Sequence, residues 1–241
     1  MARPVTQGDV EETAALLAAT QEHGMLTLPD LTEAALFCLE PAGSALVEDQ
    51  SWQSWHALPA ARREQLSALA LDDLVTRGLL DRASAGSAVA APPLALVLQG
   101  RRQPNVVVVC SVPGAPSRSE PRMYALAEQG HGVRFVLAER GGEHQVRHYG
   151  LATPTRAGRM LAAWTVEGSG RRGLLRRTPT RTIALYRYDE GAPLVRDTLQ
   201  VQPGEPLLVR REARDGSAPT QAMMDAEQLG LLLTDLLLGR Q

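Results

Sequence analysis

From residue 92 onward, this 241-residue chain shows one pattern twice, and the repetition constrains the fold more than any single motif does. In each copy, short apolar segments separated by Gly and Pro turns precede a segment whose apolar residues recur at helical spacing. The copies repeat in pattern rather than in letters. Strands that follow one another through short turns pair in an antiparallel fashion. We therefore predict an α+β fold in which two strand-strand-strand-helix units share one mostly antiparallel sheet.

The first unit is expected over residues 92–167. Its strands are predicted at residues 92–98, 105–112, 122–128, 133–139 and 143–149. Residues 106–110 are four valines and a cysteine, a run that is typical of a strand buried on both faces. A helix capped by Thr153 or Thr155 is predicted to close the unit, with Ala157 on its apolar face.

The second unit is expected over residues 182–241, after an Arg- and Gly-rich linker at residues 168–181. Its strands are predicted at residues 182–188, 194–201 and 205–213. A final helix is predicted from Ala218 or Thr220 to Leu238, because apolar residues recur there at the spacing of one helix face.

The N-terminal region, residues 1–91, has a mainly helical pattern instead. Three helices are predicted, one at residues 8–22 capped by Thr6, one that begins at Asp30 with Glu33 completing a capping box, and one between Pro59 and Gly78. The segment at residues 71–82 is similar to the recognition helix and wing entry of winged-helix proteins, in which an Arg-Gly-Leu turn leads into a hairpin. We therefore interpret this region as winged-helix-like.

Charge separates the two parts of the chain. The net charge is -2, but residues 1–86 hold 13 acidic residues and 5 Arg, whereas the rest of the chain holds 14 acidic residues and 20 Arg. A helix that reads the major groove of DNA offers basic or amide side chains, whereas the winged-helix-like segment offers Asp72 and Asp73. Nucleic acid binding through residues 1–86 is therefore not expected, and a nucleic-acid footprint would have to lie on the later arginines.

A protein partner is the better expectation, and six residues are candidates to contact it. Trp52 and Trp55 could form one exposed aromatic anchor, the kind of side chain that dominates interfaces, or could pack in the core. The core hypothesis predicts that replacing both with Ala lowers the melting temperature. The other four candidates are the arginines of the linker, Arg171, Arg172, Arg176 and Arg177.

Patterns that resemble catalytic or cofactor motifs lack the context that their chemistry needs. Every basic residue apart from the histidines is Arg, which excludes Schiff-base and phosphate-loop lysines. Gly-Ser-Gly-Arg-Arg-Gly at residues 168–173 has the letters of a dinucleotide-binding fingerprint, but a predicted helix precedes it where that motif needs a strand. We therefore expect no cofactor.

Metal and nucleophile sites are weakly supported as well. His144 and His148 fall on a predicted strand, where residues four apart are separated by about 13 Å, too far to share one metal ion. Cys110 with His131 or His144 could supply a nucleophile and a base, but the glycine pattern of a nucleophile elbow is missing. We predict no catalytic residue and no metal site.

The expected location is the cytoplasm. Residues 1–24 are acidic and Ala-rich, unlike the basic and apolar start of an export signal. Apolar runs are far shorter than the roughly 20 residues of a membrane span. Cys38 and Cys110 lie in apolar stretches and are expected to be buried, reduced thiols. The oligomeric state is left open.

The order of these elements resembles the EspG family of ESX (type VII) secretion-associated proteins. The features that carry the resemblance are an acidic helical start, two strand-rich units each closed by a helix, and the stretch Ala-Arg-Arg-Glu-Gln-Leu-Ser-Ala-Leu-Ala-Leu-Asp-Asp-Leu-Val-Thr-Arg-Gly-Leu at residues 61–79. The resemblance implies a cytosolic, non-enzymatic chaperone with a quasi-twofold α+β fold that binds a helical pair of secretion substrates. It carries over no binding residue.

Two other classes of function remain open. One is a transcription regulator in which a winged-helix head is joined to a ligand-sensing or dimerising αβ domain, and the acidic charge of residues 1–86 places it second. The other is an enzyme of unrecognised type.

Overall fold

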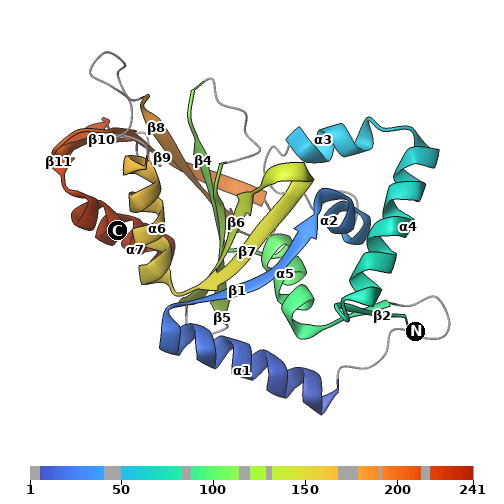
Figure 1. Cartoon of the computed structure of the whole chain (residues 1–241). Helices are drawn as coiled ribbons and strands as arrows, with labels where there is room; N and C mark the ends of the chain where they lie inside the picture. The colour runs from blue at the N-terminus through green and yellow to red at the C-terminus, as the bar shows by residue number, and fades with distance from the viewer. Residues whose placement is uncertain are drawn as a thin grey trace.

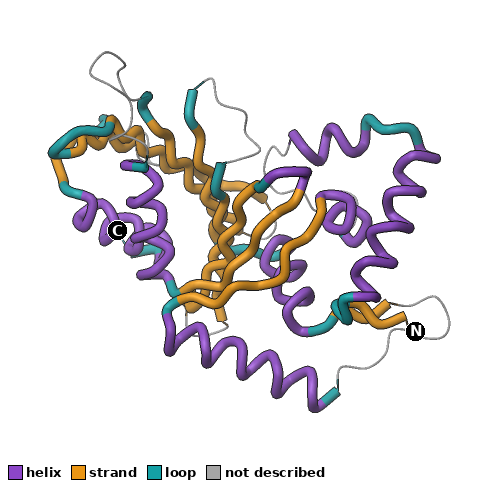
Figure 2. Tube along the Cα trace, in the orientation of Figure 1, coloured by secondary structure: helices purple, strands orange, loops and turns teal. Residues whose placement is uncertain are grey.

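The computed structural model describes residues 6–40, 50–82, 88–113, 120–128, 132–167, 179–189, 192–212 and 218–240. Within these residues the α+β prediction is confirmed, since α-helices lie on both sides of one nine-stranded antiparallel sheet (Figures 1 and 2). The helices are α1 (Gln7–His23), α2 (Glu33–Leu39), α3 (Gln50–His56), α4 (Ala60–Thr76), α5 (Pro92–Arg102), α6 (Pro154–Val166) and α7 (Ala226–Leu238).

The large sheet has the strand order β1-β7-β6-β5-β4-β8-β9-β10-β11. Its strands are β1 (Met25–Thr32), β4 (Val106–Ser111), β5 (Arg122–Glu128), β6 (Gly132–Gly141), β7 (Val146–Ala152), β8 (Arg181–Asp189), β9 (Ala192–Gln202), β10 (Leu207–Glu212) and β11 (Thr220–Met224). A separate hairpin of β2 (Leu80–Arg82) and β3 (Ala88–Ala90) follows α4.

The large sheet contains two four-stranded meanders, each closed by a helix. Strands β4 to β7 precede α6, strands β8 to β11 precede α7, and β4 pairs with β8 between the two meanders. We call β4 to α6 the first half and β8 to α7 the second half. The prediction of three strands per unit was wrong, because each half has four strands. In the second half the fourth strand is β11, formed by residues 220–224, and the helix begins only after Asp225. The Asp225 carboxylate accepts a hydrogen bond from the amide of Gln228, which completes a capping box.

The strand predicted at residues 92–98 was also wrong, because these residues form most of α5. Pro92 lies in the first turn of the helix, where a missing N–H costs no hydrogen bond. Leu94, Val97 and Leu98 then fall on one face and are buried. Two prolines before an apolar run favour a helix start as readily as they favour a strand edge.

The N-terminal helices α1 and α4 lie where they were predicted, and α1 has the expected Thr6 cap. The second helix does not begin at Asp30. Instead, β1 extends through Thr32, and the Thr32 side chain accepts a hydrogen bond from the Ala35 amide and caps α2. Strand β1 pairs with β7, so the N-terminal region supplies an edge strand of the large sheet.

The sheet buries an apolar core on each face. Helices α6 and α7 pack over one face, and α2, α3, α4 and α5 pack over the other (Figure 1). Where α6 crosses α7, a Cβ added to Gly158 would lie 2.5 Å from the carbonyl oxygen of Gly230. The close helix crossing therefore depends on the missing side chain of Gly158. Among the described residues, no helix combines the length and the apolar character that crossing a bilayer requires.

Candidate functional site

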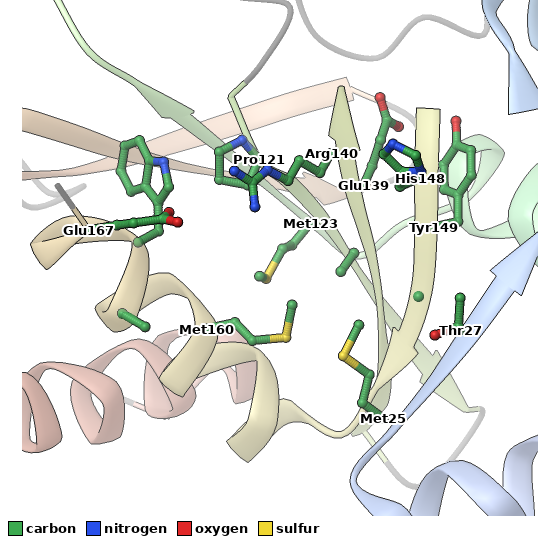
Figure 3. A pocket seen from close by; sticks show the side chains of 14 residues that line it. Met25, Thr27, Pro121, Met123, Glu139, Arg140, His148, Tyr149, Met160 and Glu167 are labelled. Atoms are coloured by element: carbon green, nitrogen blue, oxygen red, sulfur yellow. The ribbon is translucent and has the colours of Figure 1, made fainter. Parts of the chain in front are cut away.

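A hollow lies between α6 and the first half of the sheet, and Figure 3 shows its side chains. Its floor is one row of residues across four strands. Met123 on β5 is opposite Ala138 on β6, Ala138 is opposite Gly150 on β7, and Gly150 is opposite Thr27 on β1. Directly opposite residues share a face of the sheet. Because the two central residues are Ala and Gly, their small side chains leave a depression in the middle of the row.

The side wall of the hollow is the face of α6 that carries Met160, Ala163 and Trp164. We call the space between this wall and the floor row the α6 groove. Its volume is about 590 Å³, within the range of ligand-binding sites. The side chains of Met25, Met123 and Met160 point into it together (Figure 3). Methionine is flexible and polarizable, so these side chains can adapt to apolar partners of different shape.

Gly150 has a specific role in the floor. A Cβ added there would lie 2.4 Å from Cε of Met25, so the missing side chain leaves room for the methionine to lie over the strand. A larger residue at this position would displace Met25 into the groove and reduce its volume.

Polar groups lie at the rim of the groove. Nδ1 of His148 is 2.9 Å from a carboxylate oxygen of Asp30. Arg140 on β6 is opposite His148 on β7, and Figure 3 shows both side chains. At the C-terminal end of α6, the guanidinium carbon of Arg181 is 4.8 Å from the ring centre of Trp164, which is a cation–π contact. The groove therefore has an apolar middle and polar ends.

A second cavity of about 510 Å³ continues the α6 groove toward the start of α6. It shares Met25 and Thr27 with the groove and reaches Arg156 and Arg159. Among the described residues, no carboxylate forms an ion pair with Arg156, Arg159 or Arg140. Basic groups without an ion pair to any described residue therefore lie near both ends of the apolar floor.

The opposite face of the same strands holds a buried network of charges. Glu139 accepts hydrogen bonds from Arg101 and from Arg147, the latter at 2.6 Å. Arg147 also donates to Glu33 at 2.9 Å, and Arg101 donates to Glu40 at 2.6 Å. The network joins α2, α5, β6 and β7, and all five side chains are buried. Tyr124 and Ser51 contribute further hydrogen bonds, so most polar atoms are satisfied.

Electrostatics inside this network favour the ionised carboxylate of Glu139. Burial alone would raise its pKa, but Arg101, Arg147 and Arg122 together lower the pKa to about 2. Burial and the nearby Glu139 carboxylate raise the pKa of Tyr149, which therefore stays protonated. Glu139 therefore stays ionised and Tyr149 stays protonated near neutral pH, so this pair suits a structural role better than proton transfer.

The structure places the two tryptophan candidates of the sequence on α3. Trp55 is buried and Trp52 is half-buried, and both rings contact Phe37 of α2, with ring centres 5.3 Å apart for Trp52 and 6.1 Å apart for Trp55. Trp52 also meets the ring of His56 edge-on. Much of the surface of the pair is therefore used in packing α3 on α2. The four arginines Arg171, Arg172, Arg176 and Arg177 lie outside the described residues.

Three of the four residues considered for nucleophile or metal chemistry lie among the described residues. His144 belongs to a 3-10 turn rather than to the predicted strand, whereas His148 lies on β7. Cys110 is fully buried, and burial raises the pKa of its thiol, which keeps it protonated. His131 lies outside the described residues. Within the part of the chain that the structure describes, no cluster of His, Cys, Asp and Glu could hold a metal ion.

Sequence reasoning missed the α6 groove. Its methionines come from three separate segments, and they meet only through the register of four strands and the packing of α6 beside them. A signal was present in part, because Ala and Gly interrupt two otherwise bulky strands at Ala138 and Gly150. The pairing of β1 with β7, which places these residues beside Thr27, was not predicted.

Comparison with protein-family models finds no family that matches the chain. A search of curated proteins finds no significant match either.

Proposed function

We propose that this chain is a non-enzymatic, cytoplasmic adaptor or chaperone that holds a helical segment of a partner protein in the α6 groove. The observation that carries the proposal is the open apolar floor, where Met25, Met123 and Met160 converge between rims that include arginines. Methionine-lined grooves suit amphipathic helices, because the flexible side chains repack around different apolar residues.

The charges around the groove specify the partner further. Arg140 stands at one end, and Arg156 and Arg159 stand near the other. Acidic side chains that flank an apolar stripe would pair with these arginines, which gives orientation and faster association. The occupant is therefore an amphipathic helix with an apolar face and acidic ends. The resemblance to the EspG family, whose members bind helical substrates, supports a helix over an extended peptide.

The winged-helix-like interpretation remains part of a second proposal, a transcription regulator. The order of α4, β2 and β3 supports it, because a hairpin follows a helix as in a wing. Two observations argue against DNA binding. Helix α4 presents Asp72 and Asp73. The guanidinium of Arg77 donates hydrogen bonds to the Asp73 carboxylate and to the carbonyl oxygen of Asp30. An electrophoretic shift that disappears with added salt would favour this second function.

The groove proposal is tested with Ala163→Arg, which places a long charged side chain at the mouth of the α6 groove. Ala163 is exposed, so the folded chain tolerates the change. The matched control is Ala15→Arg on the exposed side of α1, away from the groove. A tagged wild-type chain and the control should retain the same partner from the native host, and Ala163→Arg should lose it.

A peptide experiment then distinguishes a helix from other occupants. The helical segment of the retained partner, made as a labelled peptide, should bind the wild-type chain and lose affinity by tenfold or more with Ala163→Arg, a free-energy change of about 1.4 kcal/mol. Binding should also weaken as salt rises. Retention of the partner by Ala163→Arg would overturn the proposal, as would mass spectra that show only a small apolar molecule in the groove.

A further inference from the structure

The two edges of the large sheet are formed differently. Because the halves correspond strand for strand, β11 in the second half matches β7 in the first half. Strand β7 carries β1 on its outer side, with Met25 opposite Ala152. Among the described residues, no strand pairs with the outer side of β11. The position beside β11 thus corresponds to the one that β1 fills.

The outer edge of β1 is protected against a further strand. Pro29 has no backbone N–H, and the pairing with β7 shifts between Leu28 and Leu31. The Arg77 side chain also donates a hydrogen bond of 2.8 Å to the carbonyl oxygen of Asp30. Proline, an irregular register and a covering side chain are the usual means by which proteins block an edge strand.

Among the described residues, strand β11 shows none of these three features. Its sequence, Thr-Gln-Ala-Met-Met, has no charge and no proline, and it pairs with β10 in regular register from Leu207–Met224 to Arg211–Thr220. Residues 220–223 are exposed, and the side chain of Met223 is 60% exposed. An uncharged, regular edge strand is a template for pairing with another chain.

We infer that the occupant of this position is β11 of a second copy of the chain, paired in an antiparallel fashion around a two-fold axis. Such pairing is self-complementary. Centred on Ala222, it places Gln221 opposite the second copy's Met223 and Thr220 opposite its Met224, so no like charges meet. Each copy presents an edge that β10 already holds in extended form, which lowers the entropy cost relative to a disordered peptide.

The difference between the two edges also limits the assembly to a dimer. Head-to-tail pairing of β11 with β1 of another copy would build an open filament, but Pro29 and Arg77 block that edge. Pairing of β11 with β11 closes after two copies. Because the strand is short, the interface is small, and we expect a dissociation constant between about 10 µM and 1 mM. The pairing uses a surface separate from the α6 groove.

Sedimentation velocity over a concentration series tests the dimer with the full chain. The double variant Gln221→Lys, Met223→Lys places like charges opposite each other in the pair while both residues stay exposed in the monomer. It should raise the dissociation constant by at least tenfold, and the neutral variant Gln221→Ser, Met223→Thr should change it far less. A wild-type chain that stays monomeric at 1 mM, or a dimer that the lysines leave unchanged, would overturn the inference.

Single cysteines locate the axis. Ala222→Cys places two thiols opposite each other at the two-fold axis and should form an intermolecular disulfide, whereas Thr220→Cys should not. The native thiols interfere little, because burial raises the pKa of Cys38 to about 11 and that of Cys110 further. Equal cross-linking at both positions, or none at either, would contradict the antiparallel pairing. Another protein found at this edge would assign the position to a different partner.

Discussion

The two halves of the sheet share one strand order and one closing helix, but their surroundings differ. In the first half, β1 extends the sheet, helices α2 to α5 cover one face, and α6 leaves a groove over the other. In the second half, four leucines of α7 fill the space against the sheet, and polar residues such as Gln202 and Arg210 occupy the face away from α7. The same scaffold therefore acquires an open groove where the N-terminal region joins it.

The largest loss of stability is expected in the first half, if buried charge is concentrated there. Glu139→Gln leaves Arg101 and Arg147 without their shared carboxylate, so the free energy of unfolding should fall by about 3–5 kcal/mol in urea denaturation. The comparison in the second half is Asp197→Asn, whose carboxylate is 3.4 Å from the partly exposed Arg211. That loss should be about 1–2 kcal/mol. Equal losses would show that the two halves do not differ in this respect.

The next prediction concerns the helical layer that only the first half carries. Trp55→Ala should lower stability by about 3–5 kcal/mol, because it empties a buried site against Phe37. Trp52→Ala should cost less, since Trp52 is half-buried. Thermal melting of both single variants and the double variant measures this. A double variant of unchanged stability that lost its partner would assign the tryptophans to an interface instead.

The pH dependence of stability sharpens the same comparison. The folded state holds the pKa of Glu139 at about 2, below its ordinary value of 4.5. A lowered pKa contributes stability that is complete above about pH 4.5 and is lost as the pH falls toward 2, an effect on the order of 3 kcal/mol. Urea denaturation at a series of pH values should therefore show that the free energy of unfolding of Glu139→Gln falls less on acidification than that of the wild-type chain. Identical declines would exclude this carboxylate as the cause.

The smallest effects are expected at the crossing of α6 and α7, where each half contributes one glycine. Gly158→Ala would bring Cβ to 2.3 Å from Oγ1 of Thr234, so a loss of about 1–3 kcal/mol is expected. Gly230→Ala would meet Cα of Arg159 at 3.6 Å, an ordinary contact, and should change stability by less than about 1 kcal/mol. Differential scanning calorimetry compares the two variants. Similar losses would mean that the crossing is tight on both sides.

The fold could be predicted from sequence where local pattern decides structure. Helix α1 is set by the Thr6 cap, and most strands of the first half are set by β-branched runs and turns. The errors fell where local signals conflict. Pro92 before an apolar run opens a helix here, and the methionines of β11 have no strong strand preference, so pairing with β10 decides its conformation.

The candidate site could not be predicted from local sequence patterns. The α6 groove depends on Ala138 and Gly150 lying side by side, which follows from the register of β6 and β7 rather than from either segment alone. It also depends on β1, whose partner strand lies more than a hundred residues later in the chain. Long-range pairing of this kind carries no signature in a single sequence.

The pairing of Met25 with Ala152 has a consequence for synthesis of the protein. The ribosome completes β1 long before β7 emerges, so Leu28 and Leu31 remain exposed until the residues that bury them are synthesised. Closing so long a loop is slow, whereas the meander of the second half needs only neighbouring segments. Nascent chains should therefore be most vulnerable to aggregation during the interval in which β1 has been synthesised but β7 has not yet paired with it.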